Sequence, residues 1–296
     1  MQPGSLKAIG TMVLGVALFS FMDAGLKALS ASYSPIQVTS LRAASSLPFL
    51  LGSIAVTGSW HQLRTASLVP HLARTALGLL MLLSFIYSVS VQSLTDCYAV
   101  FMSAPLMVAA LSWPILGERV PLPRWLAIAI GMAGVLVALR PSGAGFISLG
   151  GLAAALSAAC YSVNALTIRV MGRKDSSQAM VFWYILFLML SAGALALPTW
   201  KPIAPHDWPL IAFVGAIGAA AQHLVTNAFR LGSPSTVAPF EYTALFWGLG
   251  LDYTIFGILP VPRVLIGGAI VIVGGLYLIR EQRRSSATPA TIPLDF

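Results

Sequence analysis

Charged residues are scarce in this chain. Asp, Glu, Lys and Arg together make up 9% of the 296 residues, whereas soluble domains carry about 25%. Hydrophobic residues make up 57%. A soluble fold of this size has too few polar side chains here to cover its surface. The composition therefore excludes a soluble globular domain and favours a protein embedded in a lipid bilayer.

Cysteine and acidic residues are also scarce. The two cysteines, Cys97 and Cys160, lie in or beside apolar segments without metal-ligand spacing, which argues against a disulfide framework and a metal site. The chain has 9 acidic and 17 basic residues, a net charge of +8. The basic residues lie between apolar runs rather than among stacking aromatics, as in membrane proteins. We expect no cofactor, no metal and no nucleic-acid partner.

Long apolar runs occupy most of the sequence. A membrane-spanning helix needs roughly 20 apolar residues. Ten such runs are predicted, at residues 6–29, 35–57, 68–92, 95–116, 122–140, 147–170, 178–199, 208–230, 234–259 and 261–281. Most Lys and Arg residues flank them on the side of the N-terminus, which predicts a multi-pass protein of the inner (cytoplasmic) membrane with both termini cytoplasmic.

The two halves of the sequence are similar. Residues 121–140 read PLPRWLAIAIGMAGVLVALR, and residues 260–280 read PVPRVLIGGAIVIVGGLYLIR. Five spans in each half, an odd number, would invert the second half relative to the first, and inverted repeats occur in many secondary transporters. We predict an all-α integral membrane fold of ten transmembrane helices in two inverted repeats, residues 1–141 and 142–282. Residues 283–296, rich in Ser, Thr and Pro, are predicted to be a disordered cytoplasmic tail.

Three segments carry a family resemblance. They are SAPLMVAALSWPILGERV at 103–120, Arg140-Pro141, and VAPFEYTALFWGLGLDYTIFG at 237–257. They resemble the fourth helix, the end of the fifth and the ninth helix of ten-helix EamA-type members of the drug/metabolite transporter (DMT) superfamily. One departure is Ile258, which stands where members commonly repeat the acidic residue found here as Glu118. The resemblance implies a proton-coupled or facilitated carrier of small metabolites without an ATPase domain.

The predicted function is secondary transport of a small-molecule substrate by alternating access. Because exporters of amino acids and their derivatives are prominent in the family, the resemblance favours export of amino acids or related, including aromatic, compounds. The alternatives are an uptake carrier or facilitator for another metabolite, such as a nucleoside derivative or a cationic drug, and a passive channel. An intramembrane enzyme would need a metal cluster or an activated nucleophile, and no His pair has ligand spacing, so we predict that the chain is not an enzyme. We expect a monomer or weak dimer.

Candidate substrate-binding residues combine polar and aromatic side chains. Glu241 follows Pro239, where a broken helix would leave free carbonyl groups, and a buried carboxylate there could bind a proton or a substrate ammonium group. Helical spacing places Tyr161 and Asn164 on one face. For single residues, interhelical hydrogen bonding or ordinary packing is the alternative. The candidates are Tyr87, Tyr98, Phe101, Met102, Tyr161, Asn164, His223, Asn227, Glu241, Tyr242 and Trp247.

Four further charged residues lie within the predicted spans: Asp23, Lys27, Arg42 and Asp252. Charges inside a membrane are costly and are therefore candidates for proton coupling or structural pairing. Asp23 and Lys27 are four residues apart on one helix face and could neutralise each other. Arg42 could pair with Asp23 instead, or meet an anionic group of the substrate.

Overall fold

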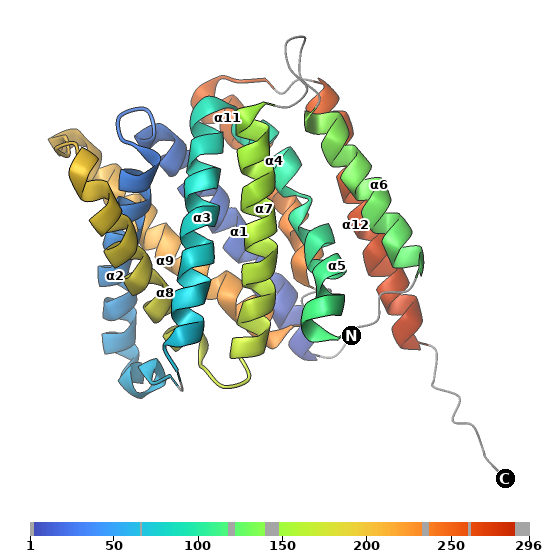
Figure 1. Ribbon diagram of the computed structural model, residues 1–296, viewed down its shortest axis with the longest axis horizontal. Helices are drawn as coiled ribbons and strands as arrows, with labels where there is room; N and C mark the ends of the chain where they lie inside the picture. Colours follow the sequence, from blue (N-terminus) through green and yellow to red (C-terminus); the bar gives the residue numbers. More distant parts are fainter. Residues whose placement is uncertain are drawn as a thin grey trace.

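The computed structural model describes residues 3–65, 67–117, 122–139, 148–232, 237–259 and 262–287. Within these ranges all regular structure is helical, as predicted (Figure 1). The first half contains α1 (Pro3–Leu29), α2 (Pro35–Thr57), η1 (Ser59–Leu63), α3 (Val69–Val91), α4 (Leu94–Phe101), α5 (Ala104–Leu116) and α6 (Leu122–Leu139). The second half contains α7 (Leu149–Met171), α8 (Ser177–Ala196), η2 (Leu197–Thr199), η3 (Pro205–Asp207), α9 (Trp208–Leu231), η4 (Ala238–Tyr242), α11 (Thr243–Phe256) and α12 (Pro262–Ala287).

Each predicted span corresponds to helical structure. In the described part of the chain, 6 helices are long and apolar enough to cross a membrane alone, and the bent pair α4 and α5 makes up to 7. The remaining predicted spans correspond to α6, to η4 with α11, and to α12. Residues 283–287 were predicted to be disordered, but they are helical, because α12 continues to Ala287. The segment REQRR at 280–284 consists of residues with high helix propensity, which extend the helix.

The two halves are interleaved in an antiparallel arrangement. α1 packs along α9, and α3 packs along α7, so the first and third helices of each half contact the third and first of the other. α2 packs against α8, and α6 lies beside α12 (Figure 1). These are the pairings expected when two similar units are related by inversion, and the start of α1 and the end of α12 lie on the same side of the bundle (Figure 1). The inverted-repeat prediction is confirmed.

Both fourth helices of the repeats are broken. Met102 and Ser103 separate α4 from α5, and the 3-10 turn η4 precedes α11. The two broken segments end alike, because Gly117 caps α5 at φ 73° and Gly257 caps α11 at φ 64°, a left-handed conformation that glycine adopts without strain. Glu118, the acidic residue that follows Gly117, lies outside the described residues.

Close helix contacts depend on small residues. A Cβ atom added to Gly215 of α9 would lie 2.5 Å from the backbone carbonyl carbon of Ser45 in α2. A Cβ atom on Gly134 of α6 would lie 2.8 Å from the carbonyl oxygen of Gly267 in α12. These contacts support the structural role expected for small residues in membrane bundles.

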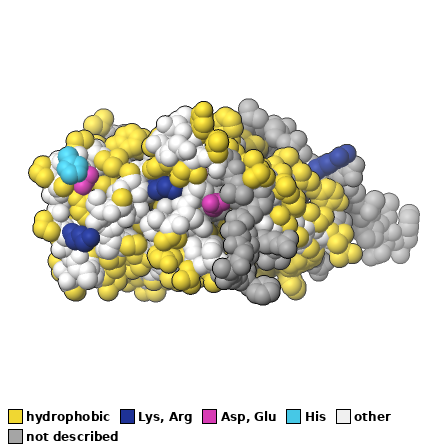
Figure 2. Space-filling model, turned by 90° about the horizontal axis from the view of Figure 1, so that it is seen from above, with side chains coloured by type: hydrophobic (Ala, Val, Ile, Leu, Met, Phe, Trp, Pro, Cys, Tyr) yellow, Lys and Arg dark blue, Asp and Glu magenta, His cyan; other side chains and the backbone are white. Residues whose placement is uncertain are grey.

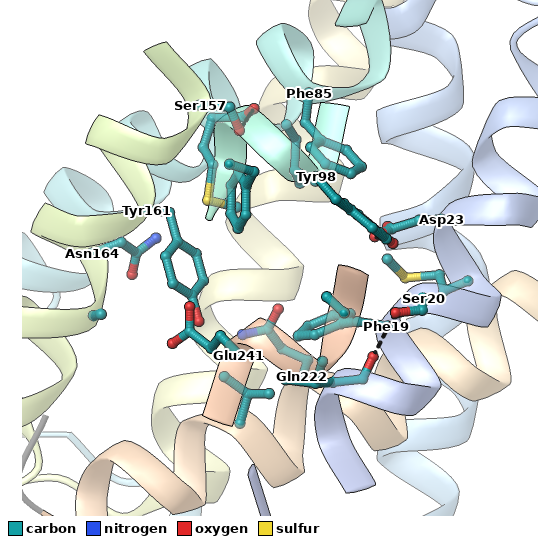
Figure 3. A pocket seen from close by; sticks show the side chains of 18 of the residues that line it. Phe19, Ser20, Asp23, Phe85, Tyr98, Ser157, Tyr161, Asn164, Gln222 and Glu241 are labelled. Carbon is teal, nitrogen blue, oxygen red and sulfur yellow. Dashed lines mark hydrogen bonds between the residues drawn. The ribbon is translucent and has the colours of Figure 1, made fainter. Parts of the chain in front are cut away.

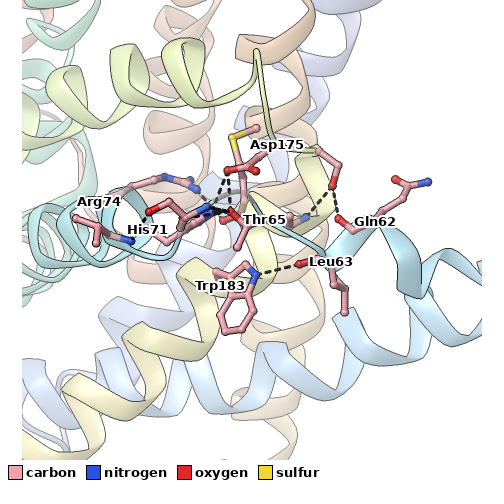
Figure 4. Close-up of polar contacts among 12 residues, drawn as sticks. Gln62, Leu63, Thr65, His71, Arg74, Asp175 and Trp183 are labelled. Atoms are coloured by element: carbon pink, nitrogen blue, oxygen red, sulfur yellow. Dashed lines mark hydrogen bonds and ion pairs between the residues drawn. The ribbon is translucent and has the colours of Figure 1, made fainter.

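Polar contacts tie loops and helix ends together at the ends of the bundle. At the end that contains the termini, a polar cluster joins η1 and the start of α3 to the turn between α7 and α8 (Figure 4). There His71 Nε2 lies 3.1 Å from Asp175 Oδ2, and the Trp183 indole donates to the Leu63 carbonyl at 3.0 Å. The opposite end presents mostly hydrophobic and uncharged side chains, with isolated charges among them (Figure 2).

Candidate functional site

A cavity lies between the two halves. Its walls come from α1, α2, α3 and α4 of the first half and from α7, α8, α9, η4 and α11 of the second. Most of the lining is apolar, but four buried charged side chains face it: Asp23, Arg42, Arg74 and Glu241. Pockets of this kind, apolar with a few convergent polar groups at an interface between units, are typical ligand sites.

An aromatic wall runs through the cavity from α4 to α9. Ring centroids follow each other from Tyr98 to Phe85 at 6.2 Å, from Phe85 to Phe101 at 5.8 Å, and from Phe101 to Tyr161 at 5.2 Å. Phe229 continues the series at 6.3 Å from Tyr161. These separations are in the range of favourable aromatic contacts, and the wall offers ring surface to a flat substrate.

An acid and a tyrosine adjoin on each side of the cavity (Figure 3). On one side Tyr98 of α4 donates a 2.7 Å hydrogen bond to Asp23 of α1. On the other side Glu241 of η4 lies beside the hydroxyl group of Tyr161 of α7 (Figure 3). In the first half the acid is on the first helix and the tyrosine on the broken fourth helix. In the second half the tyrosine is on the first helix and the acid on the broken fourth helix.

Glu241 is the less satisfied of the two acids. Its side chain is 3% exposed, and within the described structure neither carboxylate oxygen has a hydrogen-bond partner. An ionised carboxylate in such a place is costly unless a proton or a cation neutralises it. This arrangement makes Glu241 available to a proton or to a cationic group that enters the cavity.

The two arginines are held by neutral acceptors. Arg74 donates to Asn164 Oδ1 at 2.9 Å and to the Met180 carbonyl at 2.7 Å. Arg42 donates to the Met22 sulfur at 3.1 Å and approaches Gln222 Oε1 at 3.5 Å. Guanidinium groups retain their charge inside proteins, so both bring a positive charge to the cavity.

The structure brings about half of the predicted site residues together. Those that line the cavity are Asp23, Arg42, Tyr98, Phe101, Met102, Tyr161, Asn164 and Glu241. Those outside its lining are Lys27, Tyr87, His223, Asn227, Tyr242, Trp247 and Asp252. Substrate binding by the first group stays a prediction.

Helix periodicity explains the aromatic and polar candidates that lie elsewhere. Tyr87 is 38% exposed, because Phe85, two residues earlier on α3, occupies the cavity face. Trp247 packs on Phe21, with ring centroids 5.8 Å apart. Tyr242 is buried beside the cavity rather than in its lining.

The helix α9 shows the same effect. Gln222 and Val225 of α9 face the cavity, which turns His223 and Asn227 away from it. Both of these side chains are half-buried, and Asn227 accepts a hydrogen bond from Ser177 of α8 at 3.3 Å. Both candidates therefore lie on a face of α9 that points away from the cavity.

Lys27 and Asp252 have structural partners instead of substrate-facing positions. Asp252 of α11 accepts hydrogen bonds from the backbone N–H groups of Leu94 at 3.1 Å and Thr95 at 2.6 Å, so it caps α4 from the other half. Lys27 donates to the Gln92 carbonyl at 2.7 Å, at the C-terminal end of α3. The expected neutralisation of Asp23 by Lys27 is wrong, because each group is held by another partner.

Several lining residues were missed by the sequence reasoning. Arg74, Tyr184, Phe85, Phe19 and Gln222 all face the cavity. Arg74 had a signal, since it is a charged residue inside the predicted span 68–92, but it was not among the charged candidates. The aromatic residues had no such signal, because apolar spans contain many aromatics that only pack.

A helical membrane bundle with inverted halves around a polar and aromatic cavity defines a membrane transporter. The sequence model of the EamA-like transporter family matches residues 6–140 and 148–280, one match in each half. The chain belongs to this family, a multi-pass membrane transporter of the drug/metabolite type.

Characterised relatives cover almost the whole chain. The chain is 26% identical to a riboflavin transporter of Vibrio cholerae, over 86% of this chain and 89% of the relative. It is 23% identical to the pseudopaline exporter CntI of Pseudomonas aeruginosa, over 92% and 95%. It is 24% identical to an S-adenosylmethionine uptake transporter of Rickettsia conorii, over 95% of each. A crystal structure with 17% identity has the same fold, with a TM-score of 0.69 over 96% of this chain and 99% of that one.

Proposed function

We propose that this protein is a secondary carrier that moves a small metabolite with a flat aromatic ring and charged groups across the inner membrane by alternating access. The observation that carries the proposal is the cavity between the inverted halves, which combines an aromatic wall with four buried charged side chains. Aromatic amino acids and their derivatives are compatible with this lining. Carriers with inverted repeats open such a site to one side at a time.

The broken helices supply places where the halves can move. Met102 lies in the break that follows α4, and it lines the cavity. Glu241 lies in the 3-10 turn η4 that precedes α11, and it also lines the cavity. A change of angle at either break would therefore move a side chain that faces the substrate, which couples occupancy of the cavity to its opening.

The names of the relatives support a ring-containing substrate. Riboflavin and S-adenosylmethionine, named for two of them, both contain a flat heteroaromatic ring system. The same comparisons name an exporter and an uptake transporter, so both directions occur among proteins similar to this one. We propose that the net direction follows the gradients of substrate and proton, with export of an aromatic amino acid derivative as the first case to test.

Proton coupling is proposed at Glu241. Its buried carboxylate lacks a hydrogen-bond partner within the described structure, and a proton or a substrate cation would remove the cost of its charge. A proton bound to Glu241 would exclude a substrate cation, and a bound cation would exclude the proton. This mutual exclusion is what exchange of a proton for a cationic substrate requires.

The orientation of the carrier follows from charge. Arg169, Arg173, Lys174 and Arg230 lie on α7, α9 and the turn after α7, at the end of the bundle that contains the chain termini. We propose that this end is cytoplasmic.

Flux into proteoliposomes tests the proposed function. The panel is L-tryptophan, riboflavin and S-adenosylmethionine, each with and without a proton gradient. We expect saturable flux of at least one compound and a loss of its response to the gradient in Glu241→Gln. Asp96→Asn is the matched control, because Asp96 is an acidic residue outside the cavity lining. Absence of saturable flux for the whole panel contradicts the carrier, and unchanged gradient dependence in Glu241→Gln contradicts the proton site.

A further inference from the structure

Two arginines face the cavity, and neither forms an ion pair within the described part of the chain. Arg42 of α2 is 4% exposed and Arg74 of α3 is 1% exposed. In the described part of the chain, the ion pairs within 4 Å are His71 with Asp175 and His206 with Asp207, so neither arginine is in contact with a carboxylate. Asp23 and Glu241 line the same cavity without a direct ion pair to either arginine. Buried positive charge that is not paired directly is costly, and in membranes such residues are candidates for functional sites.

The donors of the two guanidinium groups are incompletely used. The Nη2 atom of Arg74 is buried and has no hydrogen-bond partner in the described structure. Arg42 directs its Nε atom at the sulfur of Met22, and thioether sulfur is a weak acceptor. Both side chains therefore retain hydrogen-bonding capacity toward a molecule in the cavity.

Tyr184 of α8 lines the cavity together with both arginines and packs on Arg74. Its ring centroid lies 4.7 Å from the guanidinium carbon of Arg74, a cation–π distance. The ring is packed tightly against α3, because a Cβ atom added to Gly78 would overlap it. The arrangement is thus fixed before any ligand enters.

We infer that Arg42 and Arg74 form a subsite for one carboxylate group of the transported molecule, beside the aromatic wall. Guanidinium groups bind carboxylates through paired, charge-assisted hydrogen bonds. The balance of charge supports a single anionic group. The two arginines in the cavity are balanced by Asp23 and Glu241 when both acids are ionised. Once a proton or a substrate cation neutralises Glu241, one positive charge remains uncompensated. This subsite rests on the proposed function, since it specifies the substrate as an aromatic carboxylate.

Matched probes test the subsite without knowledge of the natural substrate. Phenylacetate and phenylacetamide have almost the same shape, but only phenylacetate is charged. Their binding is measured from the rise in Tm of the purified protein in lipid nanodiscs at constant ionic strength, because a ligand of the folded state raises Tm with concentration. We expect phenylacetate to bind at least about tenfold more tightly than phenylacetamide, because only the carboxylate forms paired, charge-assisted hydrogen bonds with guanidinium groups.

Variants assign the difference to the arginines. Arg42→Gln should abolish the preference for phenylacetate, and Arg42→Lys and Arg74→Lys should retain part of it. The matched control is Arg173→Gln, which removes an exposed arginine outside the cavity and should bind as the wild type does. Arg74→Gln should lose the preference too, but Arg74 also bonds to Asn164 and Met180. Its Tm without ligand must first show that it folds.

The possible results separate the subsite from the carrier. Equal binding of the two probes, no phenylacetate response in the wild type, or an undiminished preference in Arg42→Gln overturns the subsite. If riboflavin or L-tryptophan is still transported in that case, the carrier proposal stands alone. If none of the panel is transported although phenylacetate binding depends on the arginines, the subsite stands and the carrier proposal fails.

Discussion

The hydroxyl group of Tyr98 donates a 2.7 Å hydrogen bond to Oδ2 of Asp23, joining the broken fourth helix to the first helix at the edge of the cavity. Asp23 is 8% exposed and Tyr98 is 3% exposed. A carboxylate that loses such a partner inside the bundle remains desolvated without compensation, which costs about 1–3 kcal/mol.

Tyr98→Phe is therefore expected to destabilise the folded protein by about 1–3 kcal/mol. Thermal unfolding in nanodiscs measures the effect, with Tyr253→Phe as the control because Tyr253 is 63% exposed. The double variant Asp23→Asn, Tyr98→Phe should lose less than the sum of the single losses, because the two residues share one interaction. Full additivity would show that the hydrogen bond has no energetic weight.

Asp252 is expected to act through folding rather than substrate binding. It is fully buried and accepts hydrogen bonds from Leu94 and Thr95 at the start of α4. Asp252→Ala removes this cap and leaves the N–H groups without their acceptor, so a loss of about 1–3 kcal/mol is expected. Measured per folded molecule, the KM of any transported compound should stay unchanged. A large rise in KM without a change in Tm would instead place Asp252 at the substrate.

Asp252 and Arg74 show how far the sequence could lead. Apolar runs and their similarity across the halves predict the helices and the inversion, because bilayer thickness and backbone hydrogen bonding restrict the fold. Which face of each helix meets the cavity depends on packing between halves that are distant in sequence. Hence Asp252 was grouped with candidate coupling charges although it caps α4, and Arg74 was left out of the candidates although it is 1% exposed and lines the cavity.

The loop between α1 and α2 carries a contact that depends on pH. Tyr33 donates a 2.6 Å hydrogen bond to Asp207, and the backbone N–H of Ala204 donates to the Tyr33 hydroxyl group at 2.9 Å. The bond to Asp207 raises the pKa of Tyr33 above its usual value of 10.0, because the neutral phenol is the donor. The protein thereby gains stability that is complete below about pH 10 and is lost as the pH rises through the pKa of the folded state.

Tm should accordingly fall more steeply in the wild type than in Tyr33→Phe as the pH rises above about 10. Below that pH, the variant should be the less stable protein, because it lacks the bond to Asp207. Tyr253→Phe serves again as the exposed control and should follow the wild type. If wild type and Tyr33→Phe lose stability in parallel over the alkaline range, ionisation of Tyr33 has no part in it.

Gly78 provides a way to disturb the arginine subsite without removing a charge. An added Cβ atom would lie 2.5 Å from the Tyr184 hydroxyl oxygen and 2.8 Å from its Cζ atom, so Gly78→Ala must displace the ring. Overpacking of this kind costs about 1–3 kcal/mol. Because the Tyr184 ring lies against the guanidinium group of Arg74, the displacement should also weaken phenylacetate binding. Gly52→Ala in α2 is the matched control, since a Cβ atom there meets nothing within 4 Å. It should leave binding unchanged and the stability unchanged or slightly higher. If Gly78→Ala lowers Tm but binds phenylacetate as the wild type does, Tyr184 is a packing residue and does not position the arginines.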